Sequence, residues 1–217
     1  MKKKIIIFLI IVGIFLVITG LLWWQKDKIE NFLEKKEMEK IVALAKDYSI
    51  LKKTNEEFII NKKDNLRVKI PTNWKTEIGM DMFGLTSEQH VTLYSEDFSY
   101  RPPNGCLIEI QISRLREEKI ENYDGFSQIF LYEGAKEVKK MINSYKKALP
   151  KEKEGIKIIT VDQNEALEEI RILNKNIGKR ITVKIPTENR VYIFEGVLFS
   201  EKCFHEFDKF LKNISIK

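Results

Sequence analysis

A strand-like alternation of apolar and polar residues runs through most of the chain after residue 54. The clearest case is segment 107–113, in which Ile108, Ile110 and Ile112 alternate with Glu109 and other polar residues. Successive side chains of a strand point to opposite faces, so this alternation predicts a half-buried antiparallel strand. The same criterion predicts three earlier strands, at residues 58–60, 66–70 and 90–95.

A helical period interrupts the strands at residues 126–149. Apolar residues recur there at spacings of three and four, as on one face of an amphipathic helix, and Pro150 follows. Four more strands are predicted after it, the last three forming a meander, and a closing helix begins near Ser200: the strands are 156–161, 166–173, 180–185 and 190–199. The order strands, helix, strands, helix predicts an α+β domain.

The first residues follow neither pattern. Three lysines precede an uncharged apolar run at residues 5–24, which at the helical rise covers about 30 Å of hydrocarbon. A secretory signal peptide is the competing interpretation, but its apolar region is shorter and ends in small residues, whereas Trp23 and Trp24 stand here. We therefore predict a basic tail (1–4) and an uncleaved transmembrane helix (5–24) that contacts membrane lipid.

The orientation of this helix rests on the form of the N-terminus. Lysines near the two ends of the span are close to equal in number, so the distribution of positive charge does not decide. A short basic tail ahead of a long apolar run resembles a signal anchor. We expect a single-pass protein of the cell membrane, with its N-terminus in the cytoplasm and its C-terminal domain outside it.

Residues 25–54 are predicted to form an amphipathic juxtamembrane helix or linker. Apolar residues from Ile29 to Leu51 are spaced by three and four, which places one apolar stripe on a helix. A coiled-coil stalk is the alternative, but the stripe lacks the three or more clean heptads that a coiled coil shows. The folded extracytoplasmic domain is accordingly expected to comprise residues 55–217.

The string Val-Lys-Ile-Pro-Thr occurs twice, at residues 68–72 and 183–187. Proline has no N–H to give to a strand ladder, so it is common where a strand runs into a turn. The residues that flank the two copies differ. We interpret the copies as two strand ends and not as an internal duplication.

Charge narrows the classes of partner. The chain has 38 basic and 32 acidic residues, a formal net charge of +6, but the two signs alternate finely along its length. A protein that binds nucleic acid gathers its Lys and Arg on one stripe or motif. No nucleic-acid partner is therefore expected.

Signatures of catalysis and of cofactor or metal binding are absent from the sequence, which has no GxGxxG, P-loop, HExxH or CxxC motif. Neither a cofactor nor a metal site is predicted. Cys203 and His205 resemble a thiol and base pair, but residues two apart on a helix face different sides and cannot meet. Trp74, beside Pro71, is expected in the core and not as a ligand-stacking ring. No catalytic residue is assigned.

The two cysteines, Cys106 and Cys203, are expected to remain thiols. A disulfide needs their Cα atoms within about 4.4 to 6.8 Å, and nothing in the sequence brings them together.

One loop is a candidate for contact with a partner. Tyr100 and Arg101 are residue types enriched at interfaces, and Pro102 and Pro103 stiffen the segment before it binds. A plain turn is the alternative. The expected partner is an envelope protein whose identity the sequence does not give.

Two segments resemble the PsbP-like superfamily, which includes the extrinsic photosystem II protein PsbP and bacterial envelope proteins of the DcrB type. FIINKKDNLRVKIPTNWKTE (58–77) is similar to its opening strands, which end in Ile-Pro-x-x-Trp. RVYIFEGVLFSEKCFHEFDKFLKNISI (190–216) is similar to its closing strand, helix and short final strand. The resemblance implies a central antiparallel sheet with helices on both faces, an α/β/α sandwich, in a protein that binds or assembles something, and it implies no catalytic residues.

These inferences lead to one main hypothesis and one alternative. The main hypothesis is a membrane-anchored extracytoplasmic PsbP-like domain that acts as a non-catalytic binding or assembly module in the cell envelope. The alternative is an envelope hydrolase that uses Cys203 or a carboxylate. An enzyme of that kind needs a nucleophile and a base about 3 Å apart in a polar cleft, whereas a binding module needs only an exposed apolar or aromatic patch.

The expected orientation is testable with a protease. Protease added to intact, wall-stripped cells should digest a tag at the C-terminus of the chain, because the domain would lie outside the membrane. The measurement is the loss of the tag on a blot, with a cytoplasmic protein as the protected control. A tag that survives until the membrane is broken would reverse the orientation.

Overall fold

The computed structural model describes residues 20, 36, 38–80, 86–116, 120–123, 129–148, 155–173 and 178–216. The chain divides into two compact units, Met1–Lys40 and Ile41–Lys217. The predicted tail (1–4), transmembrane helix (5–24) and first part of the linker fall almost wholly outside the described residues. Within the described part, no helix combines the length and the apolar character needed to cross a bilayer.

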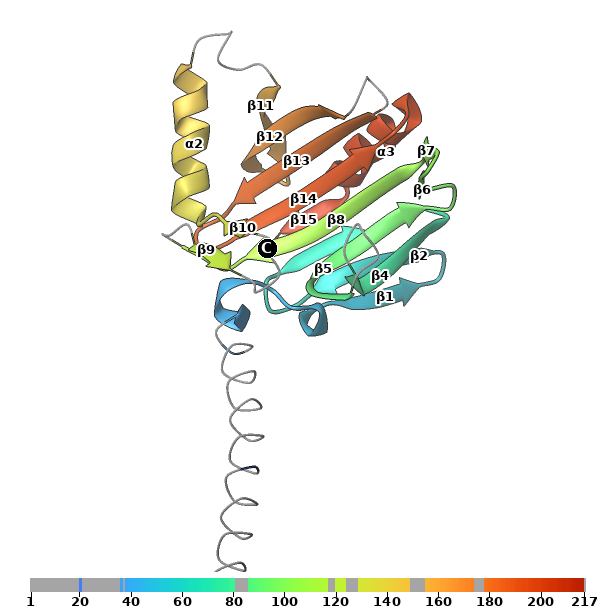
Figure 1. The fold of residues 1–217 in the computed structure, drawn as a ribbon, viewed down its shortest axis with the longest axis horizontal. Coiled ribbons are helices and arrows are strands. Elements are labelled where there is room, and N and C mark those ends of the chain that lie inside the picture. Colours follow the sequence, from blue (N-terminus) through green and yellow to red (C-terminus); the bar gives the residue numbers. More distant parts are fainter. Residues whose placement is uncertain are drawn as a thin grey trace, which may run out of the picture. The chain divides into compact units, whose positions relative to one another are not determined.

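A seven-stranded antiparallel sheet forms the centre of the second unit (Figure 1), in the order β11-β12-β13-β14-β8-β5-β4. The predicted meander is confirmed, and its last strand pairs with β8, so the two halves of the sequence meet in the middle of the sheet. The strands are β4 (Trp74–Met80), β5 (Thr86–Ser95), β8 (Cys106–Ser113), β11 (Ile156–Val161), β12 (Asn164–Leu173), β13 (Gly178–Pro186) and β14 (Val191–Leu198).

A second, four-stranded antiparallel sheet was not predicted. Its order is β1-β2-β3-β15, and its strands are β1 (Ser49–Lys53), β2 (Glu56–Asn61), β3 (Leu66–Lys69) and β15 (Ile214–Ile216). The two Val-Lys-Ile-Pro-Thr copies lie in different sheets, the first in and just after β3 and the second at the end of β13. This confirms that they are two strand ends.

One helix lies on each face of the large sheet. On one face, α2 (Ala135–Lys147) packs Val138 and Ile142 against Leu167 and Val191. On the other face lies α3 (Glu201–Lys212), which starts directly after Ser200, near the predicted position, with Ser200 as its N-cap. The large sheet with helices on both faces is thus confirmed, and the small sheet shares the α3 side, where its apolar residues join the same core.

Close packing of α3 on the sheet depends on one glycine. The rings of Phe194 on β14 and Phe210 on α3 meet edge to face at 5.8 Å. A Cβ atom at Gly196 would stand 3.0 Å from the ring of Phe207, so even an alanine there would require the ring or the helix to shift by a few tenths of an ångström.

β8 is buried on both of its faces, so the expectation of a half-buried strand is wrong. Ile108, Ile110 and Ile112 point into the main core as predicted. Glu109 and Ser113, on the opposite face, are only 7% and 0% exposed. The strand lies in the middle of the sheet, between β14 and β5, where side chains on both of its faces are covered.

The predicted helix at 126–149 is too long. Residues Ile129–Tyr132 form strand β10, which pairs with β9 (Ile120–Tyr123), and α2 begins only after Gly134. Ile, Phe and Tyr are strong strand formers, and glycine interrupts the helical pattern that their spacing imitates.

The linker helix is also wrong in its last part. Helical structure ends at residue 41; a short 3₁₀ turn η1 (Ala45–Asp47) and strand β1 follow. Val42, Ala43 and Leu44 are buried, and the N–H of Ala43 donates to the carbonyl of Ile112 at 2.9 Å. The apolar residues at this end of the stripe therefore pack in the core or belong to a strand, and they are not one face of a helix. The folded unit starts near residue 41 and not at residue 55.

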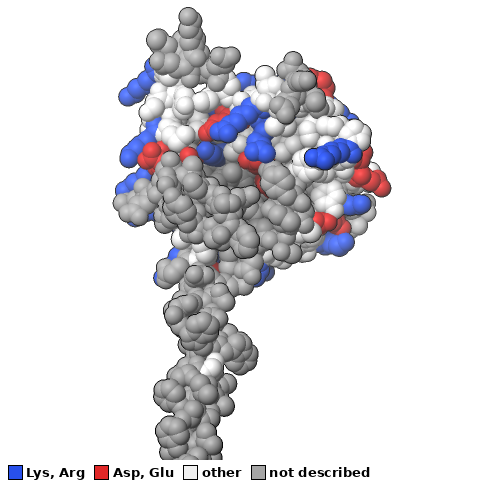
Figure 2. Space-filling view, in the orientation of Figure 1, with Lys and Arg blue, Asp and Glu red and all other residues white. Residues whose placement is uncertain are grey.

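On the face of the molecule shown in Figure 2, basic and acidic side chains of the described residues are interspersed. This matches the fine alternation of charge along the sequence.

The revised boundary predicts how truncated chains fold. A chain that begins at Ile41 should be soluble and unfold cooperatively, whereas one that begins at Asn55 should be unstable, because it lacks Val42, Leu44 and Tyr48. Each fully buried apolar side chain contributes about 1.5 to 3 kcal/mol, against a total stability of about 5 to 15 kcal/mol. Thermal unfolding followed by circular dichroism measures this, and equal midpoints for the two chains would contradict it.

Candidate functional site

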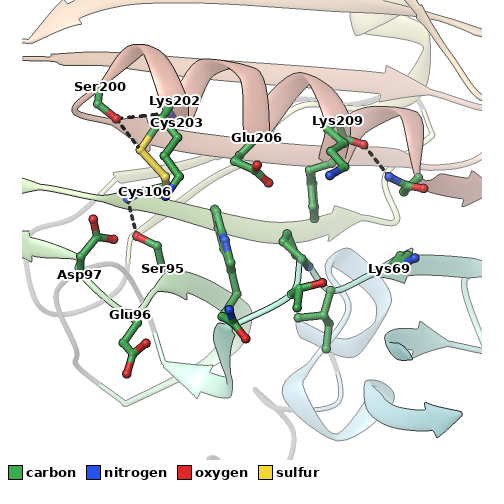
Figure 3. Close-up of a pocket in the computed structure, with 17 residues that line it drawn as sticks. Lys69, Ser95, Glu96, Asp97, Cys106, Ser200, Lys202, Cys203, Glu206 and Lys209 are labelled. Atoms are coloured by element: carbon green, nitrogen blue, oxygen red, sulfur yellow. Dashed lines mark hydrogen bonds between the residues drawn. A yellow bond between two sulfur atoms is a disulfide. The ribbon is translucent and has the colours of Figure 1, made fainter. Parts of the chain in front are cut away.

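An open pocket of about 780 Å³ lies between α3 and the connection from β3 to β4 (Figure 3). We call it the α3 pocket. One wall is α3 from Ser200 to Asn213, the other is residues 69–74, and residues 95–97 close one end. The size falls within the range of about 300 to 1,000 Å³ that ligand pockets show.

A disulfide bond forms part of the pocket lining. Cys106 on β8 and Cys203 on α3 are bonded, with Cα atoms 5.4 Å apart across 97 residues of sequence. The expectation of two free thiols is wrong, because α3 packs directly over the start of β8. Apolar lining also comes from Trp74, which packs against the main core as expected, and from Phe210.

Six charged side chains line the pocket, three of each sign: Lys69, Lys202, Lys209, Glu96, Asp97 and Glu206. Lys69 is paired outside the pocket with Glu56 at 2.5 Å. In the part of the chain that the structure describes, no hydrogen bond or ion pair engages the other five side chains. Opposite charges thus share one pocket without neutralising each other by contact.

The spacing of the charges on α3 was a usable signal that the sequence interpretation missed. Lys202, Glu206, Lys209 and Asn213 are separated by four, three and four residues, so they form one polar stripe beside the buried stripe of the helix.

Cys203 cannot act as a nucleophile, because its sulfur is held in the disulfide and its side chain is buried. The hydroxyl of the cap residue Ser200 accepts a hydrogen bond from the Cys203 N–H at 3.3 Å. His205 is exposed on another side of the helix, as its spacing predicts. The Cys203 form of the hydrolase hypothesis is therefore wrong.

Among the described residues, no group of three or more His, Cys, Asp or Glu side chains is arranged to hold a metal ion.

The predicted contact loop lies beside the pocket, as a short hairpin of β6 (Ser99–Tyr100) and β7 (Pro103–Asn104). Tyr100 is 39% exposed and Arg101, Pro102 and Pro103 are exposed as well. The Tyr100 ring meets Phe98 edge to face at 4.9 Å, and Phe98 stacks on Phe199 at 6.2 Å. We call residues 98–104 the aromatic hairpin; it is continuous in sequence with Asp97 of the pocket.

Gly105 fixes the return of the hairpin into β8. Its φ angle is +75°, a value that residues with a side chain rarely adopt. A Cβ atom there would also stand 2.6 Å from the backbone of Phe98.

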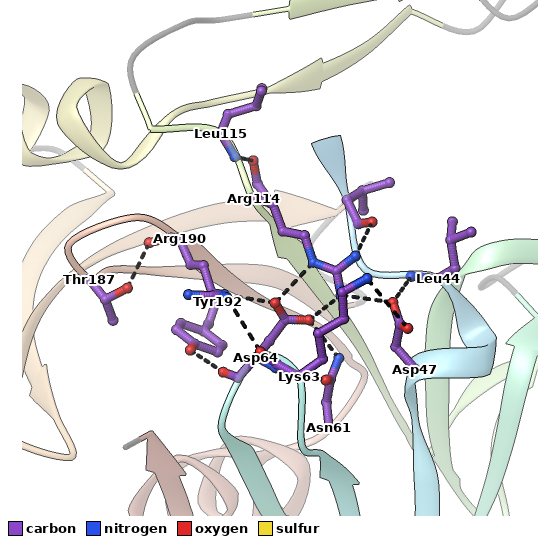
Figure 4. A network of polar contacts seen from close by, with 12 residues as sticks. Leu44, Asp47, Asn61, Lys63, Asp64, Arg114, Leu115, Thr187, Arg190 and Tyr192 are labelled. Atoms are coloured by element: carbon purple, nitrogen blue, oxygen red, sulfur yellow. Dashed lines mark hydrogen bonds and ion pairs between the residues drawn. The ribbon is translucent and has the colours of Figure 1, made fainter. Parts of the chain in front are cut away.

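At the other end of β8, a buried carboxylate organises a network of polar contacts (Figure 4). The side chain of Asp64, in the turn between β2 and β3, has no exposed surface. It accepts hydrogen bonds from Nε of Arg114 at 2.9 Å and from Nε of Arg190 at 2.7 Å. Arg114 also pairs with Asp47 at 2.7 Å, and the hydroxyl of Tyr192 donates to the Asp64 carbonyl.

This environment shifts the pKa values of its ionisable groups. Burial acts to raise the pKa of Asp64, but hydrogen bonds and charge from Arg114 and Arg190 outweigh it and leave that pKa below its usual value of 3.8. Burial raises the pKa of Tyr192 to about 12. Burial and then the nearby charge of Asp64 raise the pKa of Tyr48 far above its usual value. We call this network the Asp64 joint. Its members lie 50 and 126 residues apart along the chain, so no local pattern in the sequence indicates it.

Comparisons with known proteins show similarity at the level of structure alone. No family model and no curated protein matches the chain. Its structure is similar to the solution structure of cyanobacterial PsbP (CyanoP) from Synechocystis sp. PCC 6803, with a TM-score of 0.45 and 10% identity over 77% of this chain and 95% of that one. The predicted PsbP-like resemblance is thus borne out for the fold only.

A crystal structure of a protein from Bacteroides thetaiotaomicron VPI-5482 is also similar, with a TM-score of 0.40 and 8% identity over 70% of this chain. The chain covers 45% of that protein.

Replacing Asp64 with Asn should destabilise the folded unit by about 3 to 5 kcal/mol at neutral pH, because it leaves the buried Arg114 without its main partner. The native pKa of Asp64 lies below the unfolded value, so its contribution is complete above about pH 4 and is lost as pH falls through the native pKa. Urea unfolding of the parent and the variant between about pH 2 and pH 7 should therefore show curves that converge at the acid end.

The exposed pair of Glu56 and Lys69 gives a matched control, since Glu56→Gln should leave the unfolding midpoint nearly unchanged. An Asp64→Asn chain as stable as the parent at neutral pH would show that the joint does not hold the fold.

Proposed function

We propose that the chain is a membrane-anchored extracytoplasmic module of the cell envelope that binds a partner or ligand without catalysis. Residues 5–24 serve as the anchor, with the N-terminus in the cytoplasm. The binding surface is the α3 pocket together with the aromatic hairpin beside it.

The observation that carries the binding function is the state of the charges in the α3 pocket. Glu96, Asp97, Glu206, Lys202 and Lys209 all line the pocket (Figure 3), and their side chains make no hydrogen bond or ion pair within the described part of the chain. Charged groups left without a partner in a pocket interact favourably with a ligand that supplies hydrogen-bonding groups to them. The apolar lining next to them adds burial, which is how ligand pockets combine affinity and orientation.

The disulfide supports the extracytoplasmic placement. Disulfides form and persist in oxidising compartments and are rare in the reducing cytosol. The bond between Cys106 and Cys203 joins a central strand to a helix that covers it, so a folded domain of this kind is stabilised where the bond can form.

The aromatic hairpin supports contact with an envelope protein. Tyr and Arg are enriched at the centres of interfaces, and the Tyr100 ring is held by its edge-to-face contact with Phe98. An aromatic side chain that is already ordered loses little conformational entropy on binding.

A hydrolase is not proposed. Its Cys203 form is excluded by the disulfide. In its carboxylate form, Glu96, Asp97 or Glu206 would need a hydrogen-bonded partner for proton transfer, and the described residues provide none to these side chains.

Crosslinking and affinity capture from membranes tests the proposal. Changing Tyr100→Ala together with Arg101→Glu should weaken capture of a partner by roughly thirtyfold, the effect of about 2 kcal/mol at an interface centre. Asp97→Asn together with Glu206→Gln tests the pocket in the same assay.

Glu137→Gln on the exposed side of α2 is the matched control, and all variants are first shown to have the same thermal midpoint. Partners captured equally by the parent, both double variants and the control would refute the binding surface.

A further inference from the structure

The lining of the α3 pocket argues against a strongly charged ligand. Three lysines and three carboxylates line it, so its charges sum to zero. A phosphate-bearing ligand would meet Glu96, Asp97 and Glu206, and a polycation would meet the lysines; both are repelled by half of the lining.

The same groups favour a ligand that donates and accepts hydrogen bonds at many points. The carboxylates of Glu96, Asp97 and Glu206 only accept hydrogen bonds, and the ammonium groups of Lys202 and Lys209 only donate them. A hydroxyl group satisfies either kind, since it carries one donor and two acceptor sites. A ligand with several hydroxyls therefore matches a pocket that presents donors and acceptors on α3 and further acceptors at residues 96 and 97 (Figure 3).

Trp74 supplies the third element, a flat apolar surface at the pocket wall. It is half-buried and packs against the core on one side, while it also lines the pocket. The face of an aromatic ring carries negative partial charge, so it attracts the positively polarised C–H groups on one face of a sugar ring.

An extended peptide is a poorer match to this lining. Peptides commonly bind by adding a strand to an open sheet edge, where main-chain hydrogen bonds provide the affinity. Of the strands that reach the pocket, β3, β5 and β8 have neighbours on both sides, and the edge strand β4 contributes only its first residue. The contacts on offer come from side chains.

We propose that the α3 pocket binds an uncharged saccharide, with a sugar ring against Trp74 and its hydroxyls on the charged side chains of α3 and of residues 96 and 97. This inference rests on the proposed binding function and names the ligand class for the same site.

Tryptophan fluorescence provides a direct test, because the chain has three tryptophans, Trp23, Trp24 and Trp74. In the full chain in nanodiscs, Trp23→Phe and Trp24→Phe leave Trp74 as the single emitter. The probes are maltotriose, cellotriose and the trimer of N-acetylglucosamine, beside a pool of unblocked hexapeptides and inorganic phosphate. At least one trisaccharide should change the Trp74 emission with a saturable dependence on concentration.

Variants locate the binding. Asp97→Asn and Glu206→Gln should each raise the Kd for that trisaccharide by about tenfold, since each removes a hydrogen bond to a charged group. Lys202→Gln, on the α3 wall of the pocket, should raise the Kd as well, whereas Glu137→Gln on α2 should leave the Kd unchanged. Equal thermal midpoints establish that the variants are folded.

The outcomes separate the two proposals. The inference is overturned if no trisaccharide changes the emission, if the pocket variants bind the trisaccharide as the parent does, or if the hexapeptides or phosphate bind in place of the sugars. In each case the binding function stands where partner capture still depends on Asp97 and Glu206. If the variant at these two residues also captures its partner as well as the parent does, both proposals fail.

Discussion

The buried carboxylate of Asp64 is the contact on which the arrangement of the fold depends. Arg114 comes from the end of β8, Arg190 precedes β14, and Asp47 belongs to the segment before β1. A buried charge that loses its partners is costly, so the small sheet, the large sheet and the N-terminal segment are stable together in one relative placement. The core packing alone is non-directional, whereas this joint has a defined geometry.

The strand pair β8–β14 is held at both ends by different chemistry. Near the pairing of Ser113 with Val191 it is fixed by the Asp64 joint, and near the pairing of Cys106 with Leu198 it is fixed by the disulfide to α3. The α3 pocket is built at the disulfide end. The α3 wall is therefore bonded covalently to β8, and Trp74 of the facing wall packs against the same core as α3.

The local pattern of apolar and polar residues predicted an element correctly wherever the tertiary contacts of that segment favour the same structure. The meander, the strand ends at proline and the start of α3 near Ser200 follow from alternation, missing N–H groups and helical spacing. The pattern failed where a tertiary contact determines the secondary structure. Leu44 and Tyr48 fit a helical stripe, yet they are buried beside a 3₁₀ turn in extended backbone. Ile129 and Phe130 also fit a helix, yet they belong to a strand that pairs with another. The pocket and the Asp64 joint combine residues that only the folded chain brings together, so no window of sequence contains them.

The attachment of residues 41–43 to β8 also determines how the domain responds to pulling. The N–H of Arg114 donates to the carbonyl of Ile41 at 2.7 Å, and the N–H of Ala43 donates to Ile112. Tension applied at residue 41 therefore acts first on these two bonds and on the ion pair of Arg114 with Asp47, and it enters the large sheet at an interior strand. Under force, the domain would yield by peeling this segment from β8 before any strand of the large sheet separates.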